Sequence, residues 1–383
     1  MSEYPQRFRA LDAWRGLCAL WVAAYHFRVV GHLSSTEFVR SGAIAVDFFF
    51  VLSGFVICHG FGTKLADRTS RVQFIIRRFG RLYPLHIFTL LLVLAMEIAR
   101  WAATAQLGRP IGGPPFSGDT SPPALAANVV LVQGLGFLPN FTWNVPSWSI
   151  SVEFALCFGF LLLSLSRRRY AAAAIAAIAG GLALVLIRYH WPHGPESWTA
   201  LPRGVYGFFL GVLCYGLYRR CRRWTPTVWH EVAAVPAIAF AAYAHPAITT
   251  LAFAYAVFIF AFEAGAISRI LNRTFLVRWG DLSYSVYLLH YPMILAAFGG
   301  AIALGAGTQV GSFLDIGSPW IADALMIVFL AIVLIAAAVS YLLIEVPART
   351  YFNVHSAQWA RRLASSRQAR TPAAELPGPA ESS

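Results

Sequence analysis

The sequence predicts an all-α integral membrane protein of about ten transmembrane helices, with both termini in the cytoplasm. Of its 383 residues, 58% are hydrophobic and only 12% are charged, whereas soluble domains carry about 25% charged residues. Apolar runs of roughly 16 to 24 residues also recur along the chain, and each is long enough to cross a hydrocarbon core of about 30 Å as a helix.

The ten expected spans fill most of the chain, with bounds good to about three residues. They are residues 12–31, 42–62, 81–104, 147–166, 170–190, 203–219, 229–244, 247–264, 283–304 and 321–344. The first contains Arg15 and His26, so we expect a retained helix rather than a cleaved signal peptide. The two spans within residues 229–264 have two further interpretations, which are a broken helix pair and a re-entrant hairpin.

The number of basic residues alternates between high and low from one connecting segment to the next. This alternation indicates the orientation of the spans in the membrane. If the N-terminus is cytoplasmic, the inner segments are rich in arginine, as in residues 64–81, 167–169 and 219–223, while the outer segments hold few, chiefly Arg40, Arg109 and Arg203. Cytoplasmic loops of membrane proteins carry such an excess of Lys and Arg. An even number of spans is therefore expected.

The net charge of +13 does not indicate a nucleic-acid partner, because the basic residues form no continuous stripe and lie between apolar runs. The five cysteines include no CxxC pair, and four of them lie in apolar segments, so neither a disulfide nor a metal site is expected.

Two connecting segments differ from the spans in composition. In the outer loop of residues 105–146, proline and glycine exclude a regular helix at its start. The apolar stretch 124–138 is interpreted as a re-entrant or interfacial lid. Residues 357–383 have the composition of a disordered cytoplasmic tail, which leaves residues 1–356 as the membrane domain.

Arg15 and His26 are the first candidate functional residues. They are eleven positions apart in one expected helix, which puts them on one face at depths roughly 16 Å apart. A charged side chain at a helix centre costs about 2.5 to 3.5 kcal/mol on insertion scales, so such residues usually face the bundle interior and serve function. The alternatives are an arginine that snorkels to headgroups and a histidine that only packs.

Two carboxylates lie in the second and fourth spans. Asp47 is near the outer end of its helix, where it could orient the His26 imidazole. Otherwise it is an exposed carboxylate favoured by the helix dipole. Glu153 is expected about one turn from the outer end of its helix, in the outer half of the membrane with His26. It shares a face with Ser149 and is suited to hold or pass a proton, or else pairs with an arginine to fix packing.

An arginine cluster follows the second span at the inner face. Arg77, Arg78 and Arg81 could present guanidinium groups to the phosphates of a nucleotide-bearing donor. A role in topology or headgroup binding is equally natural for this cluster.

Taken together, these motifs resemble the acyltransferase 3 family of membrane-bound acyltransferases over about residues 8–352. The motifs, in family order, are Arg15 with His26, residues 46–54, Arg77-Arg78-x-x-Arg81 followed by Tyr83-Pro84, residues 148–153, and residues 283–292.

The resemblance implies transfer of an acyl group, commonly acetyl from cytoplasmic acetyl-CoA, to a hydroxyl of an exopolysaccharide, lipopolysaccharide or lipid-linked sugar at the bacterial inner membrane. Acyl-CoA would be a co-substrate, with no bound cofactor. No serine-hydrolase-like domain follows in this sequence, so we expect transfer to finish in the membrane domain or to pass to a separate protein. The implied catalytic residues are His26, as base or transient acyl carrier, with Arg15, Asp47 and Glu153; Arg77, Arg78, Arg81 and Tyr83 would bind the donor, and Ser149, Ser151, Tyr284 and His290 would support them.

Two other classes of protein fit the buried charges. In a proton-coupled secondary transporter, Arg15, His26, Asp47 and Glu153 would form an ion or substrate path. In a scaffolding membrane protein, the same charges would only specify helix packing.

Overall fold

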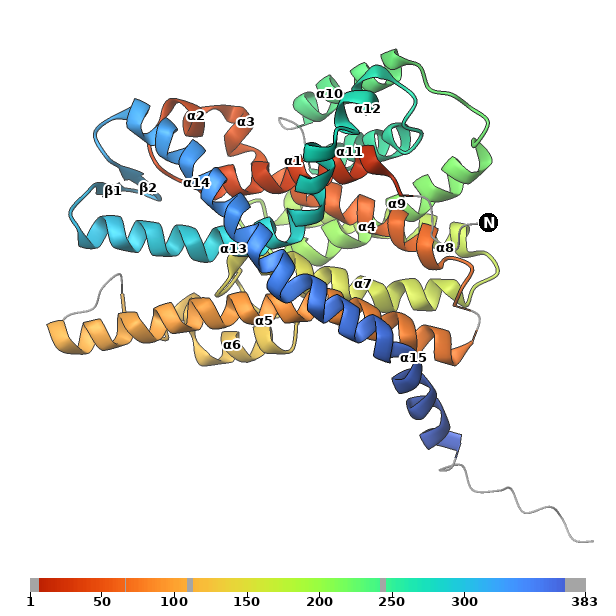
Figure 1. Cartoon of the computed structure of the whole chain (residues 1–383), viewed down its shortest axis with the longest axis horizontal. Helices are drawn as coiled ribbons and strands as arrows, with labels where there is room; N and C mark the ends of the chain where they lie inside the picture. The colour runs from red at the N-terminus through yellow and green to blue at the C-terminus, as the bar shows by residue number, and fades with distance from the viewer. Residues whose placement is uncertain (1–6, 66, 109–112, 242–245, 369–383) are drawn as a thin grey trace, which may run out of the picture.

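The computed structural model describes residues 7–65, 67–108, 113–241 and 246–368, and nearly all of its regular structure is helical (Figure 1). The long helices are α1 (Arg9–His26), α4 (Ala45–Phe61), α5 (Arg68–Leu107), α7 (Trp148–Ser164), α8 (Arg169–His190), α9 (Ser197–Arg220), α10 (Val228–Ala241), α11 (Pro246–Phe260), α13 (Thr274–Ala303), α14 (Pro319–Ser340) and α15 (Val346–Gln368). The short elements are α2 (His32–Ser35), α3 (Glu37–Arg40), η1 (Gly42–Ile44), η2 (Gly118–Thr120), α6 (Pro122–Val129), η3 (Val145–Ser147), α12 (Ala266–Leu271), the π-helical turn η4 (Tyr341–Glu345), and the antiparallel strands β1 (Thr308–Val310) and β2 (Phe313–Asp315).

Among the described residues, seven helical segments are long and apolar enough to cross a membrane. They are Glu37–Phe61, Arg68–Gln106, Val145–Ser164, Arg169–His190, Ser197–Arg220, Thr274–Ile302 and Pro319–Arg362. Seven such helices confirm a nearly all-α, multi-pass membrane protein.

Each of the ten expected spans coincides with a helix. Three of these helices are not among the seven segments named above, and the reason can be identified for each. The first, α1, carries Arg9, Asp12 and Arg15 near its start. The other two, α10 and α11, contain only 14 and 15 residues, whereas a membrane helix needs about 20. The count of ten therefore stays a prediction.

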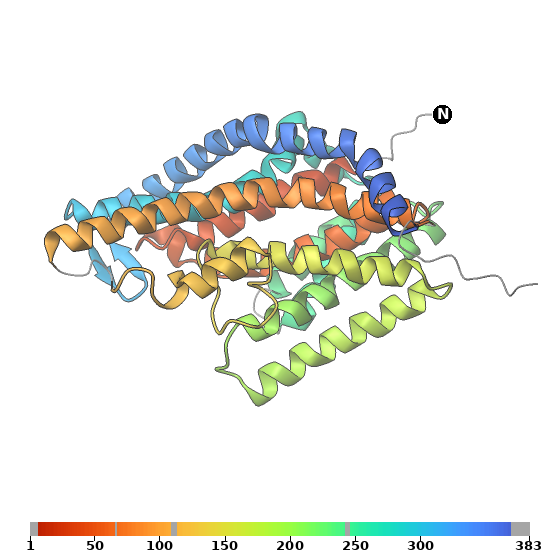
Figure 2. The same cartoon turned by 90° about the horizontal axis from the view of Figure 1, so that it is seen from below.

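Most helices run lengthwise between two ends of the molecule (Figure 2). We call one the basic end, because α1 and α5 begin there and the connections at residues 62–65, 165–169 and 221–227, which carry Lys and Arg, lie there. The opposite end, called the hairpin end, holds α2, α3 and the β1–β2 hairpin (Figure 1).

The longest helix, α5, has 40 residues and therefore spans about 60 Å. Its start is capped by the Asp67 carboxylate, which accepts the backbone N–H of Ser70 at 2.8 Å. Its end is set by Gly108, whose φ of +66° is a left-handed conformation that glycine adopts without strain.

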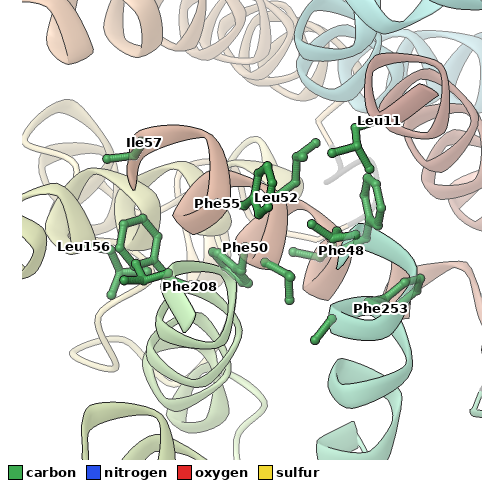
Figure 3. Close-up of a cluster of buried hydrophobic side chains, with 14 of the residues drawn as sticks. Leu11, Phe48, Phe50, Leu52, Phe55, Ile57, Leu156, Phe208 and Phe253 are labelled. Carbon is green, nitrogen blue, oxygen red and sulfur yellow. The ribbon is translucent and has the colours of Figure 1, made fainter. Parts of the chain in front are cut away.

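Helices α4 and α9 cross at very short range because glycines meet at the crossing. A Cβ on Gly54 would overlap the carbonyl of Phe208, and one on Gly211 would overlap the carbonyl of Val51. Small residues allow such close contact between membrane helices. The same α4 surface contributes large buried side chains, including Phe48 and Phe55, to the main apolar core (Figure 3).

Helices α1 and α13 approach each other in the same way. A Cβ on Gly16 would collide with the backbone at Trp279 and Gly280, and one on Gly280 would overlap the carbonyl of Asp12. This crossing brings Arg15 of α1 directly against the α13 backbone.

The connection after α5 folds back along that helix. His86 Nε2 lies 2.9 Å from the carbonyl of Asn128, and the Tyr83 hydroxyl donates to the carbonyl of Val129 at 3.1 Å. Both side chains come from the middle of α5, so the stretch 124–138 lies partway along the bundle, whereas Arg109 is outside the described residues. A lid function for this stretch stays a prediction.

A proline in α13 provides a second anchor for this connection. Pro292 has no N–H to donate to the carbonyl of Leu288 four residues earlier. The side-chain amide of Asn144 donates to that carbonyl at 3.0 Å and also to Thr89 Oγ1 at 3.0 Å. The segment leading into α7 is thus tied to α5 and α13.

The C-terminal helix departs from the expectation for residues 357–383. Helix α15 continues to Gln368 and packs along α5, with the Gly80 backbone against Phe352. Residues 357–368 are therefore helical, and residues 369–383 lie outside the described part of the chain.

Candidate active site

Several of the expected site residues line two cavities in the described part of the chain, one toward each end of the bundle. The first, which we call the arginine cavity, has a volume of about 120 Å³ and is walled by α1, α4, α5, α7 and α13. Its polar lining consists of Arg15, Ser53, Arg78, Arg81, Ser149, Glu153, Ser283, Tyr284 and Tyr287.

Arg15 is held in place by the α13 backbone it meets at the α1–α13 crossing. Its Nη2 and Nε donate to the carbonyl of Gly280 at 2.6 and 3.1 Å, and Nε also donates to Ser283 Oγ at 2.8 Å. Oδ1 of Asp12, one turn earlier in α1, lies 3.5 Å from Nη1 of Arg15. The guanidinium is thereby fixed on the cavity wall.

A partly buried ion pair forms another part of the wall. Arg78 Nη2 donates to Glu153 Oε1 at 2.5 Å, and Ser53 donates to the same oxygen at 2.9 Å. Glu153 was expected in the outer half beside His26; instead it belongs to the arginine cavity, because α7 packs on α5 at this level. Its contacts correspond to the alternative of a carboxylate that pairs with an arginine.

Arg81 is available for an anionic ligand. It lines the cavity with Arg15 and Arg78, yet among the described residues it forms no hydrogen bond and no ion pair within 4 Å. Three guanidinium groups thus surround a cavity whose lining includes a single carboxylate, Glu153. Such a site favours a ligand with several anionic oxygens.

Two members of the expected donor-binding set face elsewhere. Arg77 Nε donates to Ser356 Oγ of α15 at 3.1 Å, and Tyr83 donates to the Val129 carbonyl. Neither side chain lines the arginine cavity, because one turn of α5 directs Arg78 and Arg81 inward and Arg77 toward α15.

The second cavity, which we call the histidine cavity, lies toward the hairpin end and has a volume of about 360 Å³. Its polar and aromatic lining includes Tyr25, His26, Arg28, Phe141, Trp148, Glu196, Arg203, Tyr287, Tyr291 and Ser312. Only Tyr287 is common to both linings, so the two cavities meet at this residue.

Tyr287 is fixed at the junction by its hydroxyl group. The hydroxyl donates to the carbonyl of Pro146 at 2.8 Å and lies 2.8 Å from Ser149 Oγ. The ring of Phe49 packs edge-on against it, with centroids 5.7 Å apart. Sequence reasoning missed this role, although Tyr287 lies one helical turn from His290 in the same motif.

Asp47 does not orient His26. Its two carboxylate oxygens accept from Arg203 at 3.1 and 3.2 Å, and Arg203 also lies over the ring of Trp148. The expected pairing is wrong because α4 presents Asp47 to α9. Arg203 was missed as a site residue, although an arginine at the outer start of an apolar helix was a signal for a buried partner.

The contacts of His26 run to its own helix and to α13. Its Nδ1 lies 2.9 Å from the carbonyl of Val22 and 3.2 Å from Nε2 of His290. His290 is completely buried, and its own Nδ1 lies 3.1 Å from the carbonyl of Val286. Two histidines thus form one hydrogen-bonded pair.

The other expected supporting residues stabilise backbone. Ser151 donates to the Trp148 carbonyl and accepts the N–H of Gly134 at 2.9 Å. Tyr284 donates to the carbonyl of Leu82. Within residues 7–65, 67–108, 113–241 and 246–368, no group of three or more His, Cys, Asp or Glu side chains could hold a metal ion.

Comparisons with known proteins agree with this arrangement. The acyltransferase 3 family, described as an acyltransferase domain, matches residues 8–352. The acyltransferase MdmB of Streptomyces mycarofaciens is 26% identical over 347 residues, which cover 80% of each chain. Protein 2 in the picA locus of Rhizobium radiobacter is 36% identical over 162 residues, covering 39% of this chain and 78% of that protein.

No solved structure matches the chain. The family match extends over nearly all of the described helices and over both cavities. The chain therefore belongs to the acyltransferase 3 family and is a membrane acyltransferase.

Proposed function

We propose that this enzyme moves an acetyl group from cytoplasmic acetyl-CoA to a hydroxyl group of a glycan on the far side of a bacterial inner membrane. The observation that carries the proposal is the pair of cavities that meet at Tyr287, one lined by three arginines and the other by His26. One cavity suits an anionic donor, and the other offers a base to an acceptor.

The basic end is cytoplasmic in this proposal, and all ten helices cross the bilayer, with both termini inside. The positive-inside rule supports this orientation, because Arg and Lys gather in the connections of that end. The arginine cavity then opens toward the compartment that supplies CoA thioesters.

The donor binds through its phosphate groups to Arg78 and Arg81, since planar guanidinium groups match phosphate oxygens. Arg15 lies on the same cavity wall and adds a third positive charge to the donor site. Glu153 keeps Arg78 in its inward position through the 2.5 Å ion pair. Arg77 and Tyr83 have no part in donor binding.

His26 acts as the general base. The acceptor hydroxyl passes its proton to Nε2 of His26 while its oxygen attacks the acyl carbonyl carbon. A C–O bond forms, the C–S bond breaks, and the electron pair leaves with the CoA sulfur, which takes up the proton that His26 accepted and so restores the neutral imidazole.

The aromatic lining of the histidine cavity supports a sugar as the acceptor. Tyr25, Phe141, Trp148 and Tyr291 supply flat apolar surfaces, and Arg28 and Glu196 supply hydrogen-bonding groups. Exopolysaccharide, lipopolysaccharide and lipid-linked sugars all present suitable hydroxyls.

The experiment supplies radiolabelled acetyl-CoA to membranes of expressing cells and follows the label into the glycolipid and polysaccharide fractions. Wild type is compared with His26→Ala and Arg81→Ala, and Arg77→Ala is the matched control on the same helix. We expect label transfer to be lost in the first two variants and kept in the third.

Acetyl-CoA binding to the purified protein provides a readout that needs no acceptor. Acetyl-CoA should raise the thermal midpoint of wild type and Arg77→Ala, but not of Arg81→Ala. Equal transfer by wild type and His26→Ala would contradict the proposed chemistry, and an equal thermal shift for Arg81→Ala would contradict the donor site.

A further inference from the structure

We propose that His290 is a positioning residue that holds His26 in the tautomer and orientation needed for proton transfer. The inference rests on the proposed function, because it assigns a task to His290 only if His26 is the base. It follows from the hydrogen-bond chemistry of the two rings.

The two backbone contacts fix where the hydrogens lie. A carbonyl oxygen can only accept a hydrogen bond, so the Nδ1 atoms that face Val22 and Val286 each carry a hydrogen. In a neutral imidazole the other nitrogen is then an acceptor. Both Nε2 atoms therefore present lone pairs.

The lone pair of His290 is directed at His26. Its Nε2 lies 3.2 Å from Nδ1 of His26, so the single Nδ1–H of His26 is shared between the Val22 carbonyl and His290. His290 is completely buried, and its other nitrogen is already bonded, so its ring is fixed by its own helix.

This arrangement leaves Nε2 of His26 as the nitrogen open to the histidine cavity. It forms no hydrogen bond with any residue that the structure describes, and the ring lies on the cavity lining between Tyr25 and Tyr291. The other charged side chains that line this cavity are Arg28 of the α1–α2 connection, Glu196 before α9 and Arg203 of α9. No carboxylate in the described part of the chain forms a hydrogen bond or ion pair with the imidazole, so the neutral nitrogen of His290 takes the place that an orienting carboxylate often holds.

The consequence for the reaction concerns the charged state of His26. When Nε2 takes the proton of the acceptor hydroxyl, the imidazolium keeps its Nδ1–H bonded to two fixed acceptors. A hydrogen bond to a charged group contributes about 1.5 to 3 kcal/mol. Loss of the His290 acceptor should therefore slow transfer roughly 10- to 150-fold.

The test compares His290→Leu, which lacks the acceptor, with His290→Gln, whose side-chain oxygen can accept from His26 Nδ1. Transfer from radiolabelled acetyl-CoA to the membrane glycan fraction is measured for the full chain. For His290→Leu we expect a kcat lowered within that range and an unchanged KM for acetyl-CoA; His290→Gln should recover most of the rate. His190→Gln, at the exposed end of α8, is the control.

A double-substitution cycle separates positioning from general structural support. If His290 acts only through His26, then adding His290→Leu to His26→Gln causes no further loss of residual transfer. If His290→Leu does not fold, His290→Phe is used in its place, because phenylalanine keeps a planar ring but has no hydrogen-bond acceptor.

Wild-type rates for both His290 variants would overturn the inference, as would an equal loss in the presence and absence of His26. These results differ from failure of the proposed function, which would appear as undiminished transfer by the His26→Ala variant.

Discussion

Asp47 of α4 and Arg203 of α9 form a buried ion pair in which both carboxylate oxygens accept hydrogen bonds, at 3.1 and 3.2 Å. The Asp47 side chain is 1% exposed and that of Arg203 is 14% exposed. The pair links α4 to α9, and Arg203 also lines the histidine cavity. A change to the pair should therefore affect both the stability of the bundle and the shape of that cavity.

Removing one member of this pair should destabilise the protein strongly. Asp47→Asn leaves the buried Arg203 charge without its partner, a change that costs roughly 3–5 kcal/mol. The thermal midpoint of the purified protein measures the effect.

The double variant Asp47→Leu with Arg203→Met is the control for this prediction. It removes both charges and should be more stable than either single variant. A single variant as stable as wild type would show that the pair adds nothing to folding.

A second prediction concerns the glycine contact between α4 and α9. Gly54→Ala forces the two backbones apart, because the added Cβ would overlap the Phe208 carbonyl; overpacking of this kind costs about 1–3 kcal/mol. Gly60→Ala, in the same helix, meets open space and should raise helix stability slightly. Thermal unfolding of the two variants should therefore shift in opposite directions, and equal shifts would refute the close crossing.

A third prediction concerns the junction between the cavities. Tyr287→Ala removes the side chain that separates them and should let water reach the bound thioester. Release of free thiol from acetyl-CoA without acceptor should rise severalfold. Tyr287→Phe keeps the ring against Phe49 and should release thiol at nearly the wild-type rate; an unchanged rate in Tyr287→Ala would mean that Tyr287 does not keep the cavities apart.

The orientation of the bundle gives a fourth prediction. In a Cys221→Ser background, a cysteine at Gln309 in the β1–β2 hairpin should react with a membrane-impermeant maleimide in intact cells. A cysteine at Arg168, at the basic end, should react only after the membrane is opened. The reverse pattern would invert the proposed direction of transfer.

The sequence predicted the helices well because a run of apolar residues is a local property. Every expected span coincides with a helix, and the inward direction of Arg15 and His26 followed from their place in an apolar segment.

The partners of these residues could not be predicted, because helix periodicity gives a face but does not identify the neighbouring helix. Asp47 was matched to His26 by depth alone, yet its partner Arg203 lies 156 positions away. Glu153 was likewise expected in the outer half, yet it forms an ion pair with Arg78 and lines the arginine cavity.

The structure of the segment after α5 could not be predicted from the sequence, for a different reason. Its fold depends on long-range polar contacts, such as the Glu97 carboxylate accepting from the Phe116 N–H and the Thr120 hydroxyl. Such contacts produce no periodic pattern in the amino-acid sequence.

The separation of the two cavities by Tyr287 has an electrical consequence. The phosphates of the donor stay on the side of Arg78 and Arg81, and the acceptor stays on the side of His26. An acetyl group passes to the acceptor and the hydroxyl proton passes to the CoA sulfur, so no net charge moves between the two sides. Moving a full charge across a membrane changes the free energy by about 2.3 kcal/mol per 100 mV, whereas a neutral group is indifferent to that field. Acyl transfer by this bundle should therefore proceed at the same rate in energised and de-energised membranes, which a transporter driven by protons would not do.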